Sequence, residues 1–251
     1  MTTAHLKKYI PPTLKYWLKK ARNVVLSLIY CGKERYCPVC DKLSKKFVKH
    51  GIVENARCVH CGAHERHRIV WLYLNRKTDL FNGAPKKMLT VGVDLPFEKP
   101  LKSRLGANYL TADLFDPLAM IKMDVTNIHY PDASFDVIYC SHVLAYVPND
   151  RQGMRELFRV LKPHGWAILA DPIRYTKTID LPFIDKASST FKTFDTEEDI
   201  FHHYGPDYEE RLRAAGFKTQ AIRPADFLNA EEMEYMGITT MANDIFYCTK
   251  E

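Results

Sequence analysis

The chain has 251 residues, of which 46% are hydrophobic and 26% are charged. This balance excludes a disordered or collagen-like chain, and no heptad repeat predicts a coiled coil. No run of 18 apolar residues is present, so no segment is expected to span a membrane. The seven cysteines are odd in number and unevenly spaced, which argues against a secreted disulfide scaffold and favours a cytoplasmic protein.

Charge divides the chain into two unlike parts. Residues 1–70 contain 15 lysines and arginines and only four acidic residues, whereas the remainder is slightly acidic. A basic N-terminal region raises nucleic acid, an anionic membrane or an anionic ligand as partners, and the alternative is a charged face that only contacts water.

The first predicted element is a basic amphipathic helix within residues 1–35. Its apolar residues recur at helical spacing on one face, with basic residues on the others. The stripe comprises Leu14, Trp17, Leu18, Ala21, Val25 and Leu28. A helix that packs on the main domain as a pocket lid is the favoured interpretation; a transit peptide and an interfacial membrane helix are the alternatives.

Residues 36–64 contain two matched cysteine pairs, Cys37 with Cys40 and Cys58 with Cys61. Four thiolates satisfy a tetrahedral Zn²⁺ ion and leave no position for a catalytic water, so this spacing predicts a structural zinc ribbon. A redox Cys-x-x-Cys motif is the competing interpretation. The ribbon either contacts nucleic acid through nearby lysines or only stabilises a segment that lacks a core of its own.

A connecting helix is predicted in residues 65–85, followed by one domain in residues 86–251. From residue 86 onward, apolar strands alternate with amphipathic helices, which predicts an α/β fold with a doubly wound, mostly parallel sheet. In such sheets ligands bind beyond the carboxyl ends of the strands. Polar residues at or just after predicted strand ends are Asp94, Asp113, Asp124, Ser141 and His142.

The segment 124–169, which includes SFDVIYCSHVLAYV and ELFRVLKPHG, resembles the central block of class I S-adenosylmethionine (SAM)-dependent methyltransferases. The resemblance extends over residues 86–251 and implies a seven-stranded, Rossmann-like sheet. A zinc ribbon followed by Glu65-Arg66-His67-Arg68 also resembles a recurrent bacterial subgroup of this family.

The resemblance implies roles for individual residues in binding SAM. Asp113 would accept hydrogen bonds from the ribose hydroxyls, and Asp124 would receive the adenine amino group. Leu114 would pack on the adenine, and the backbone N–H of Val125 would face a ring nitrogen. The backbone around Gly92 would approach the methionine part. For each aspartate the alternative is a loop cap.

Two features depart from the family pattern or extend it. The glycine-rich loop after the first strand retains only one glycine, so the amino-acid end of SAM is expected to be bound differently, through Asp94 or basic side chains. Ser141 completes the cofactor-binding candidates. His142 and Tyr175 are the catalytic candidates, as a base or orienting group and as a cation–π partner of the sulfonium respectively. A core histidine is the alternative for His142.

Three functions follow from these patterns. The leading hypothesis is methyl transfer from SAM to a small-molecule or glycan-like acceptor. The second is cyclisation of SAM to azetidine-2-carboxylate with release of methylthioadenosine. The third is an RNA-binding protein or RNA methyltransferase that uses the ribbon and the basic helix. The oligomeric state is not determined by the sequence.

Overall fold

A computed structural model describes residues 11–50, 53–182, 200–239 and 244–251. The chain forms two compact units, and each is made of three separate segments that alternate along the sequence. The first comprises Met1–Asp79, Asp94–Pro100 and Phe227–Ala242; the second comprises Leu80–Val93, Leu101–Asp226 and Asn243–Glu251. The predicted division at residues 35, 64 and 85 is linear, whereas the first unit also takes in two segments from the region predicted as the main domain.

The first unit is built on short strand pairs and two longer helices. Strand β1 (Arg35–Cys37) pairs with β2 (Lys42–Ser44), and β3 (Val48–His50) pairs with β4 (Val53–Arg57), both antiparallel. Helices α2 (Pro12–Ile29), α3 (Glu65–Lys77) and α7 (Ala230–Tyr235) complete it, with the first part of α4 (Leu95–Leu105).

Helix α3 forms the centre of the first unit. Eight consecutive residues of α3, from His67 to Leu74, are buried. The ring of Trp71 stacks on Phe97, and the ring of Tyr73 meets Phe227 edge-on, with centroids 5.9 and 5.5 Å apart. These contacts explain why residues 94–100 and 227–242 belong to this unit, since the core around α3 is assembled from three distant parts of the chain.

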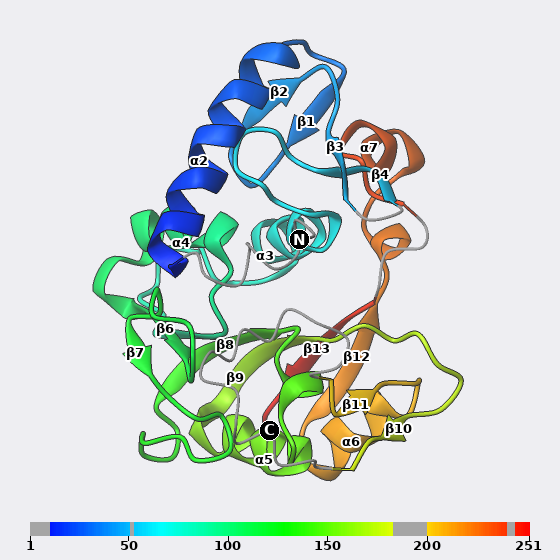
Figure 1. Ribbon diagram of the computed structural model, residues 1–251. Helices are drawn as coiled ribbons and strands as arrows, with labels where there is room; N and C mark the ends of the chain where they lie inside the picture. Colours follow the sequence, from blue (N-terminus) through cyan, green and yellow to red (C-terminus); the bar gives the residue numbers. More distant parts are fainter. Residues whose placement is uncertain (1–10, 51–52, 183–199, 240–243) are drawn as a thin grey trace. The chain divides into compact units, whose positions relative to one another are not determined.

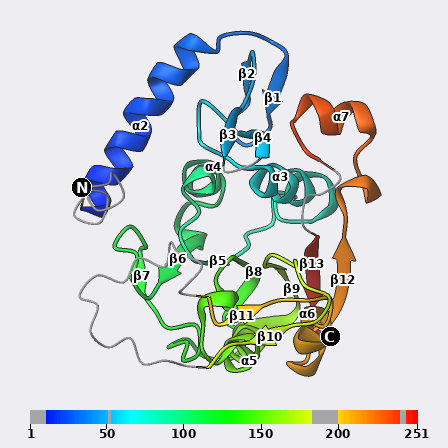
Figure 2. The same cartoon turned by 45° about the vertical axis from the view of Figure 1, so that its right-hand side comes forward.

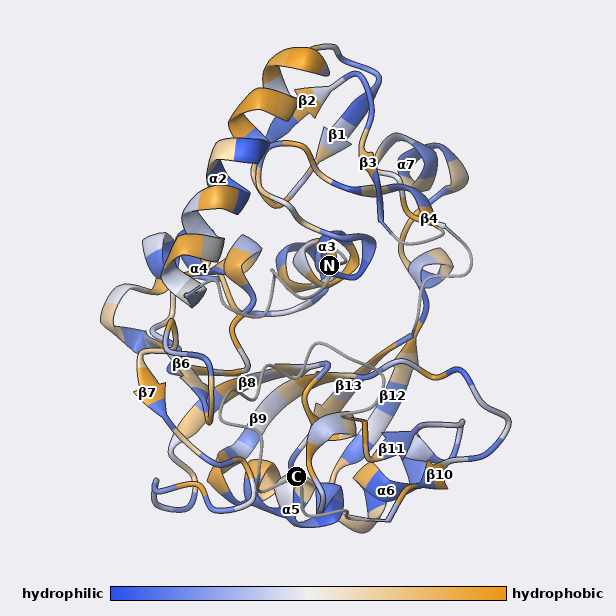
Figure 3. Cartoon of the chain, viewed as in Figure 1, coloured by the Kyte–Doolittle hydropathy of each residue, from blue (hydrophilic) through white to orange (hydrophobic). Residues whose placement is uncertain are grey.

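Helix α2 confirms the predicted N-terminal helix, and its apolar face is exposed. The apolar side chains of the stripe are exposed, from 49% for Leu14 to 75% for Leu28. The apolar positions show as orange patches along α2 in Figure 3. The predicted role of α2 as a pocket lid on the main domain stays a prediction. Among the described residues, no helix is long and apolar enough to cross a membrane.

The second unit contains a seven-stranded sheet in the order β12-β13-β9-β8-β5-β6-β7 (Figure 1). Its strands are β5 (Met88–Val91), β6 (Tyr109–Asp113), β7 (Ile121–Lys122), β8 (Phe135–Ser141), β9 (Leu161–Ala170), β12 (Lys218–Ile222) and β13 (Ile245–Thr249). Only β13 runs against both of its neighbours; the other neighbouring pairs are parallel. The predicted seven-stranded, mostly parallel sheet is confirmed.

Helices connect the parallel strands and bury the sheet. Helix α4 lies between β5 and β6 in the chain, and α5 (Asp150–Val160) lies between β8 and β9. Helix α5 is capped by Asn149, whose side chain accepts the N–H of Gln152. Its predicted apolar face is buried, with Met154 and Leu157 fully inside the core with α6 (Tyr208–Ala214).

Shorter elements complete the second unit. The 3₁₀ turns are η1 (Gly106–Asn108), η2 (Leu144–Tyr146) and η4 (Pro224–Asp226). Strand β10 (Ile179–Asp180) pairs with β11 (His202–His203) in a small antiparallel ribbon beside α6, as Figure 2 shows. Residues 183–199 lie outside the described residues.

Candidate functional site

The four predicted metal-ligating cysteines converge in the first unit. Their sulfurs all lie within 4.8 Å of one another, with Cys37 Sγ 3.7 Å from Cys61 Sγ and Cys40 Sγ 3.8 Å from Cys58 Sγ. Four sulfurs placed tetrahedrally 2.3 Å from a zinc ion are about 3.8 Å apart. The four cysteines are free rather than disulfide-bonded. The spacing of the sulfurs therefore fits a tetrathiolate metal site.

Arg68 braces this cluster from α3. Its guanidinium is fully buried and donates to the carbonyl oxygens of Ala56, Ala63 and Gly237 at 3.0, 2.9 and 2.7 Å. Ala63 O also accepts the N–H of Cys58, so Arg68 fixes the loop that carries the second cysteine pair. Burial lowers the pKa of Arg68, and negative charge on Cys37, Cys58 and Glu65 would oppose this shift. A buried cation needs such compensation, which a tetrathiolate site supplies.

Asp94 is held by α3 within the first unit. His67 Nδ1 accepts the N–H of His64, so His67 Nε2 carries the ring proton and donates to Asp94 Oδ1 at 2.9 Å. Burial lowers the pKa of His67, consistent with this neutral form. Arg66 lies 4.0 Å from the same carboxylate oxygen. Asp94 therefore has protein partners, and its predicted contact with the cofactor stays a prediction.

In the second unit, the predicted cofactor residues lie at the carboxyl ends of neighbouring parallel strands. Gly92 directly follows β5 with a φ of +85°, and an added Cβ would lie 2.8 Å from Val143 Cγ2. Only glycine adopts this conformation without strain, and its bare backbone permits close approach of a ligand. The N–H of Gly92 donates to Ala112 O at 2.9 Å, which links the ends of β5 and β6.

Asp113 ends β6 and has one oxygen fixed by its own loop. Asp113 Oδ1 accepts the N–H groups of Phe115 and Asp116 at 2.7 and 2.8 Å. The other oxygen, Oδ2, makes no hydrogen bond to any described residue. The loop-cap and ligand interpretations are thus compatible, because Oδ1 orients the carboxylate and Oδ2 stays available. Leu114 is half-buried beside it.

Asp124 repeats this arrangement in the loop before β8. Asp124 Oδ1 accepts both the N–H and the hydroxyl of Thr126 at 2.8 Å. Val125, between them, is 5% exposed. Among the described side chains none donates to Asp124 Oδ2. The two aspartates thus share a local design, a short loop cap that leaves one carboxylate oxygen for another partner.

Ser141 and His142 terminate β8. The hydroxyl oxygen of Ser141 is buried and has no hydrogen-bond partner among the described residues. A buried hydroxyl without a partner is unfavourable, and a bound polar ligand is one way to satisfy it. His142 has a φ of +56°, which is strained for a residue with a side chain, and its N–H donates to Ala170 O. Backbone strain of this kind concentrates at functional sites.

Tyr175 follows β9 and is 42% exposed. Its ring lies 5.0 Å from the ring of His203 in β11, and its N–H donates to Tyr204 O. The β10–β11 ribbon therefore positions Tyr175 through both its backbone and its side chain. No measured contact joins Tyr175 to His142, so their common catalytic role stays a prediction.

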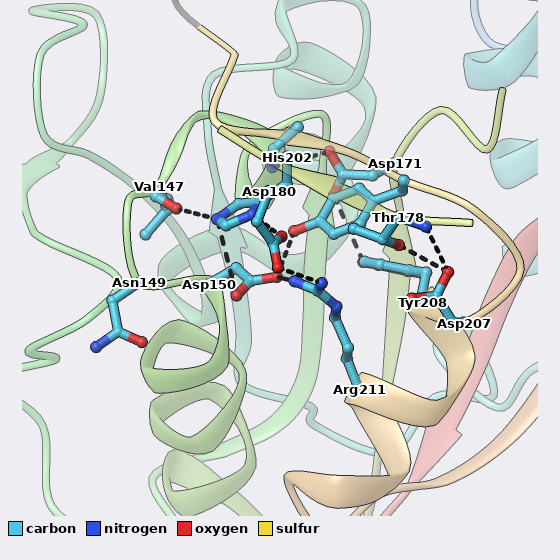
Figure 4. A network of polar contacts seen from close by, with 12 residues as sticks. Val147, Asn149, Asp150, Asp171, Thr178, Asp180, His202, Asp207, Tyr208 and Arg211 are labelled. Carbon is cyan, nitrogen blue, oxygen red and sulfur yellow. Dashed lines mark hydrogen bonds and ion pairs between the residues drawn. The ribbon is translucent and has the colours of Figure 1, made fainter. Parts of the chain in front are cut away.

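A charged network, buried at Asp150 and Arg211 and exposed at Asp180, holds the β10–β11 ribbon (Figure 4). Arg211 bridges Asp150 and Asp180 at 2.9 and 2.8 Å, and Asp180 also contacts His202 Nδ1 at 2.7 Å. Arg211 and His202 hold the pKa of Asp180 down to about 2. Tyr204 donates to Asp150 at 2.9 Å. Sequence reasoning missed Asp150 and Arg211, since neither belongs to a motif and their pairing joins residues far apart in the chain.

Asp171 sits at the end of β9 and is completely enclosed. Burial raises its pKa to about 8. Its two oxygens accept the N–H of Ala145 and the hydroxyl of Tyr208, both at 3.4 Å. Sequence reasoning identified the position as a strand end, but the burial that raises the pKa of this carboxyl depends on α6 and η2.

Comparison with known proteins places the second unit in context. Residues 88–169, about a third of the chain, match the family model described as methyltransferase domain. Phosphoethanolamine N-methyltransferase 1 of Arabidopsis thaliana is 32% identical over 94 residues, covering 38% of this chain and 18% of that protein. Demethylmenaquinone methyltransferase of Clavibacter sepedonicus is 29% identical over 128 residues, covering 45% and 51%. The chain thus spans at most about half the length of these relatives.

A SAM-dependent methyltransferase structure from Mesorhizobium loti is similar to 73% of this chain and 98% of its own, with 16% identity and a TM-score of 0.48. The matched residues run from the start of β5 into the end of β9 and contain Gly92, Asp113, Asp124 and Ser141. The family model and these relatives are methyltransferases, and each match covers less than half of this chain. The four-cysteine cluster lies outside the matched segment.

Proposed function

We propose that this chain is a SAM-dependent methyltransferase that acts on a small-molecule or glycan-like acceptor. One observation carries the proposal. Gly92, with its left-handed backbone, and Asp113, with one carboxylate oxygen unused by described residues, lie at the carboxyl ends of adjacent strands inside the matched segment. Ligands of open parallel sheets bind at this edge.

Each cofactor-binding residue has a role that its surroundings support. Asp113 Oδ2 accepts the ribose hydroxyls while Oδ1 keeps the loop in place, and Asp124 does the same for the adenine amino group. Leu114 supplies an apolar surface for the adenine, and the N–H of Val125 faces a ring nitrogen. The hydroxyl of Ser141, which has no partner among the described residues, donates to the cofactor.

When bound, SAM supplies a methyl group on a sulfonium, and its transfer needs mainly alignment and exclusion of water. In this proposal the chain provides the alignment. His142, held at a strained strand end, orients the acceptor or accepts its proton. The ring of Tyr175 stabilises positive charge by a cation–π contact.

We further propose that the four cysteines hold a structural Zn²⁺ ion. The spacing of their sulfurs and the buried Arg68 cation support this assignment. A tetrathiolate site carries net negative charge and has a closed coordination sphere, so the ion stabilises the first unit and takes no part in chemistry.

The test is mass spectrometry of purified, zinc-loaded protein incubated with SAM. Tight SAM binding without turnover, followed by S-adenosylhomocysteine formation when an acceptor is added, is the expected result. Methylthioadenosine produced without an acceptor, above the spontaneous rate, would overturn methyl transfer in favour of cyclisation to azetidine-2-carboxylate. S-adenosylhomocysteine formed only with RNA would support the RNA methyltransferase alternative, and RNA binding without SAM binding would support an RNA-binding protein.

A further inference from the structure

Helix α2 exposes its apolar face to solvent, whereas most helices of globular proteins turn that face towards the core. At 100° per residue, its apolar side chains fill one continuous arc of about 140°. The exposed large side chains of this apolar arc are Leu14 49%, Trp17 59%, Leu18 52%, Val24 58%, Val25 55%, Leu28 75% and Ile29 62%. Isolated exposed apolar residues are ordinary, but a continuous arc over an 18-residue helix indicates an interaction surface.

The polar side of α2, by contrast, faces the loops near the four cysteines. Asn23 Nδ2 donates to His60 O at 3.4 Å, and Lys45 N donates to Tyr30 O at 2.8 Å. The ammonium of Lys46 lies 4.7 Å from the centre of the Tyr30 ring. These contacts fix the helix by the face opposite the apolar arc, so the arc points away from the part of the first unit that holds the helix.

Charge identifies the partner of the apolar arc. Lys20 and Arg22 lie at its two edges, and residues 1–33 contain no acidic residue. Lys20 Nζ lies 5.0 Å from the centre of the Trp17 ring, an aromatic–cation pair of the kind that sits at the level of lipid headgroups. A basic, aromatic-edged apolar helix of this pattern lies in the interface of an anionic bilayer.

Other occupants fit this surface less well. A second copy of the chain would bring two sets of basic edges together without acidic partners on the helix. A nucleic acid would contact the basic side chains through its phosphates and would leave the apolar arc, whose large side chains are 49% to 75% exposed, in water.

We propose that α2 docks this protein on an anionic lipid surface, with the apolar arc in the boundary between headgroups and acyl chains. Lys20 and Arg22 then lie at the level of the lipid phosphates, where their long side chains reach past the apolar boundary. The anchoring is peripheral and does not depend on the proposed methyl transfer.

The test uses the full zinc-loaded chain and vesicles of phosphatidylcholine, with or without phosphatidylglycerol. We expect the protein to sediment with the vesicles that contain phosphatidylglycerol. Sedimentation with phosphatidylcholine alone should be much weaker, and salt should reduce the binding. Trp71 and Trp166 are each 5% exposed, so a blue shift of tryptophan fluorescence on binding reports Trp17. Trp17→Phe should abolish the shift while the protein still sediments.

Leu28→Glu is the decisive variant, since Leu28 is the most exposed member of the arc and its replacement leaves the fold intact. It should weaken vesicle binding at least about tenfold. Ser27→Glu adds the same charge one residue away, outside the arc, and should reduce binding far less. Equal melting temperatures and zinc content verify that both variants fold.

Four outcomes would overturn the proposal. They are no binding to either vesicle, equal binding to both lipid compositions, equal loss in the two glutamate variants, and a change of oligomeric state in Leu28→Glu without a change in vesicle binding. RNA that competes fully with vesicles would assign the basic helix to nucleic acid instead.

Discussion

At the residue scale, Asp113 shows how one carboxylate can serve both the fold and a ligand. Its Oδ1 atom ties down the loop after β6 through two backbone N–H groups, while Oδ2 bonds to no described residue. Asparagine can keep the first function, because its amide oxygen accepts the same two N–H groups. It loses the negative charge that strengthens hydrogen bonds from ribose hydroxyls.

Asp113→Asn is therefore expected to weaken SAM binding while the fold is retained. Loss of charge-assisted hydrogen bonds costs about 2 kcal/mol, or roughly thirtyfold in Kd, measured by isothermal titration calorimetry. Asp116→Asn is the matched control, because Asp116 caps the same loop through Leu118 N. An unchanged Kd in Asp113→Asn, with normal binding in the control, would remove Asp113 from the cofactor site.

Asp171 gives a prediction about pH. Its pKa is raised from 3.8 to about 8, so between about pH 4 and 8 the unfolded chain has released a proton that the folded protein keeps. The free energy of unfolding therefore falls as pH rises through this window. Asp171→Asn removes this titration, so its stability should stay nearly constant from pH 6 to pH 8, whereas the wild type should lose roughly 2 kcal/mol over that interval.

Urea unfolding of zinc-loaded protein at pH 6 and pH 8 measures this difference. The wild type should lose stability between the two values, and Asp171→Asn should lose distinctly less. Asp132→Asn is the control, since the Asp132 side chain is 78% exposed and its removal should leave the pH dependence as it was. Parallel pH profiles for the wild type and Asp171→Asn would contradict the assignment of a protonated, buried Asp171.

At the scale of elements, the local pattern predicted most of the regular structure of the second unit. The stripe of α5 and the apolar strands β5, β8 and β9 follow from period and composition, because each buries one face or both on the sheet. The sulfur cluster was predicted from the spacing of the cysteines. The two cysteines of each Cys-x-x-Cys pair are close because they are three residues apart, so only one long-range contact, between the two pairs, is needed. These features are local, or need one long-range contact.

Other features depend on distant partners and had no local signal. Arg68 looks like a surface residue in the sequence ERHR, yet its charge is enclosed by carbonyl groups from β4, the cysteine loop and residue 237. Arg211 likewise joins α6 to α5 and β10. Whether an arginine on a helix is buried depends on elements that its own sequence does not specify.

Arg68→Lys tests whether α3 stabilises the loop that carries the second cysteine pair. Lysine retains the charge but lacks the planar fork that reaches three carbonyl groups, so unfulfilled acceptors are left in the interior. We expect a loss of about 2 to 4 kcal/mol in the free energy of unfolding and faster zinc release to a chelator. Arg76→Lys, at an exposed ion pair near the end of α3, is the control and should change neither quantity appreciably.

At the scale of the whole molecule, the interleaved units determine where the chain can be divided. A boundary at residue 85 is natural in the sequence, since the βα alternation begins there. The structure, however, places residues 94–100 and 227–242 in the unit built around α3. Phe97 stacks on Trp71, Phe227 meets Tyr73, and Gly237 O accepts from Arg68, so all three lose their partners if residues 1–85 are removed.

A fragment of residues 86–251 is therefore expected to be less stable than the full chain and to aggregate, although it contains the whole seven-stranded sheet. Phe97, Met233, Met236 and Ile238 are each less than 10% exposed in the full chain and become exposed in the fragment. Contiguous apolar surface of this kind promotes aggregation. The fragment should bind the dye 8-anilinonaphthalene-1-sulfonate strongly and melt at a lower temperature than the full chain.

Co-expression of residues 1–85 as a separate zinc-loaded chain should restore solubility, because the missing partners are supplied in trans. A fragment that folds alone, with the melting temperature and SAM affinity of the full chain, would show that the sheet does not depend on the α3 core.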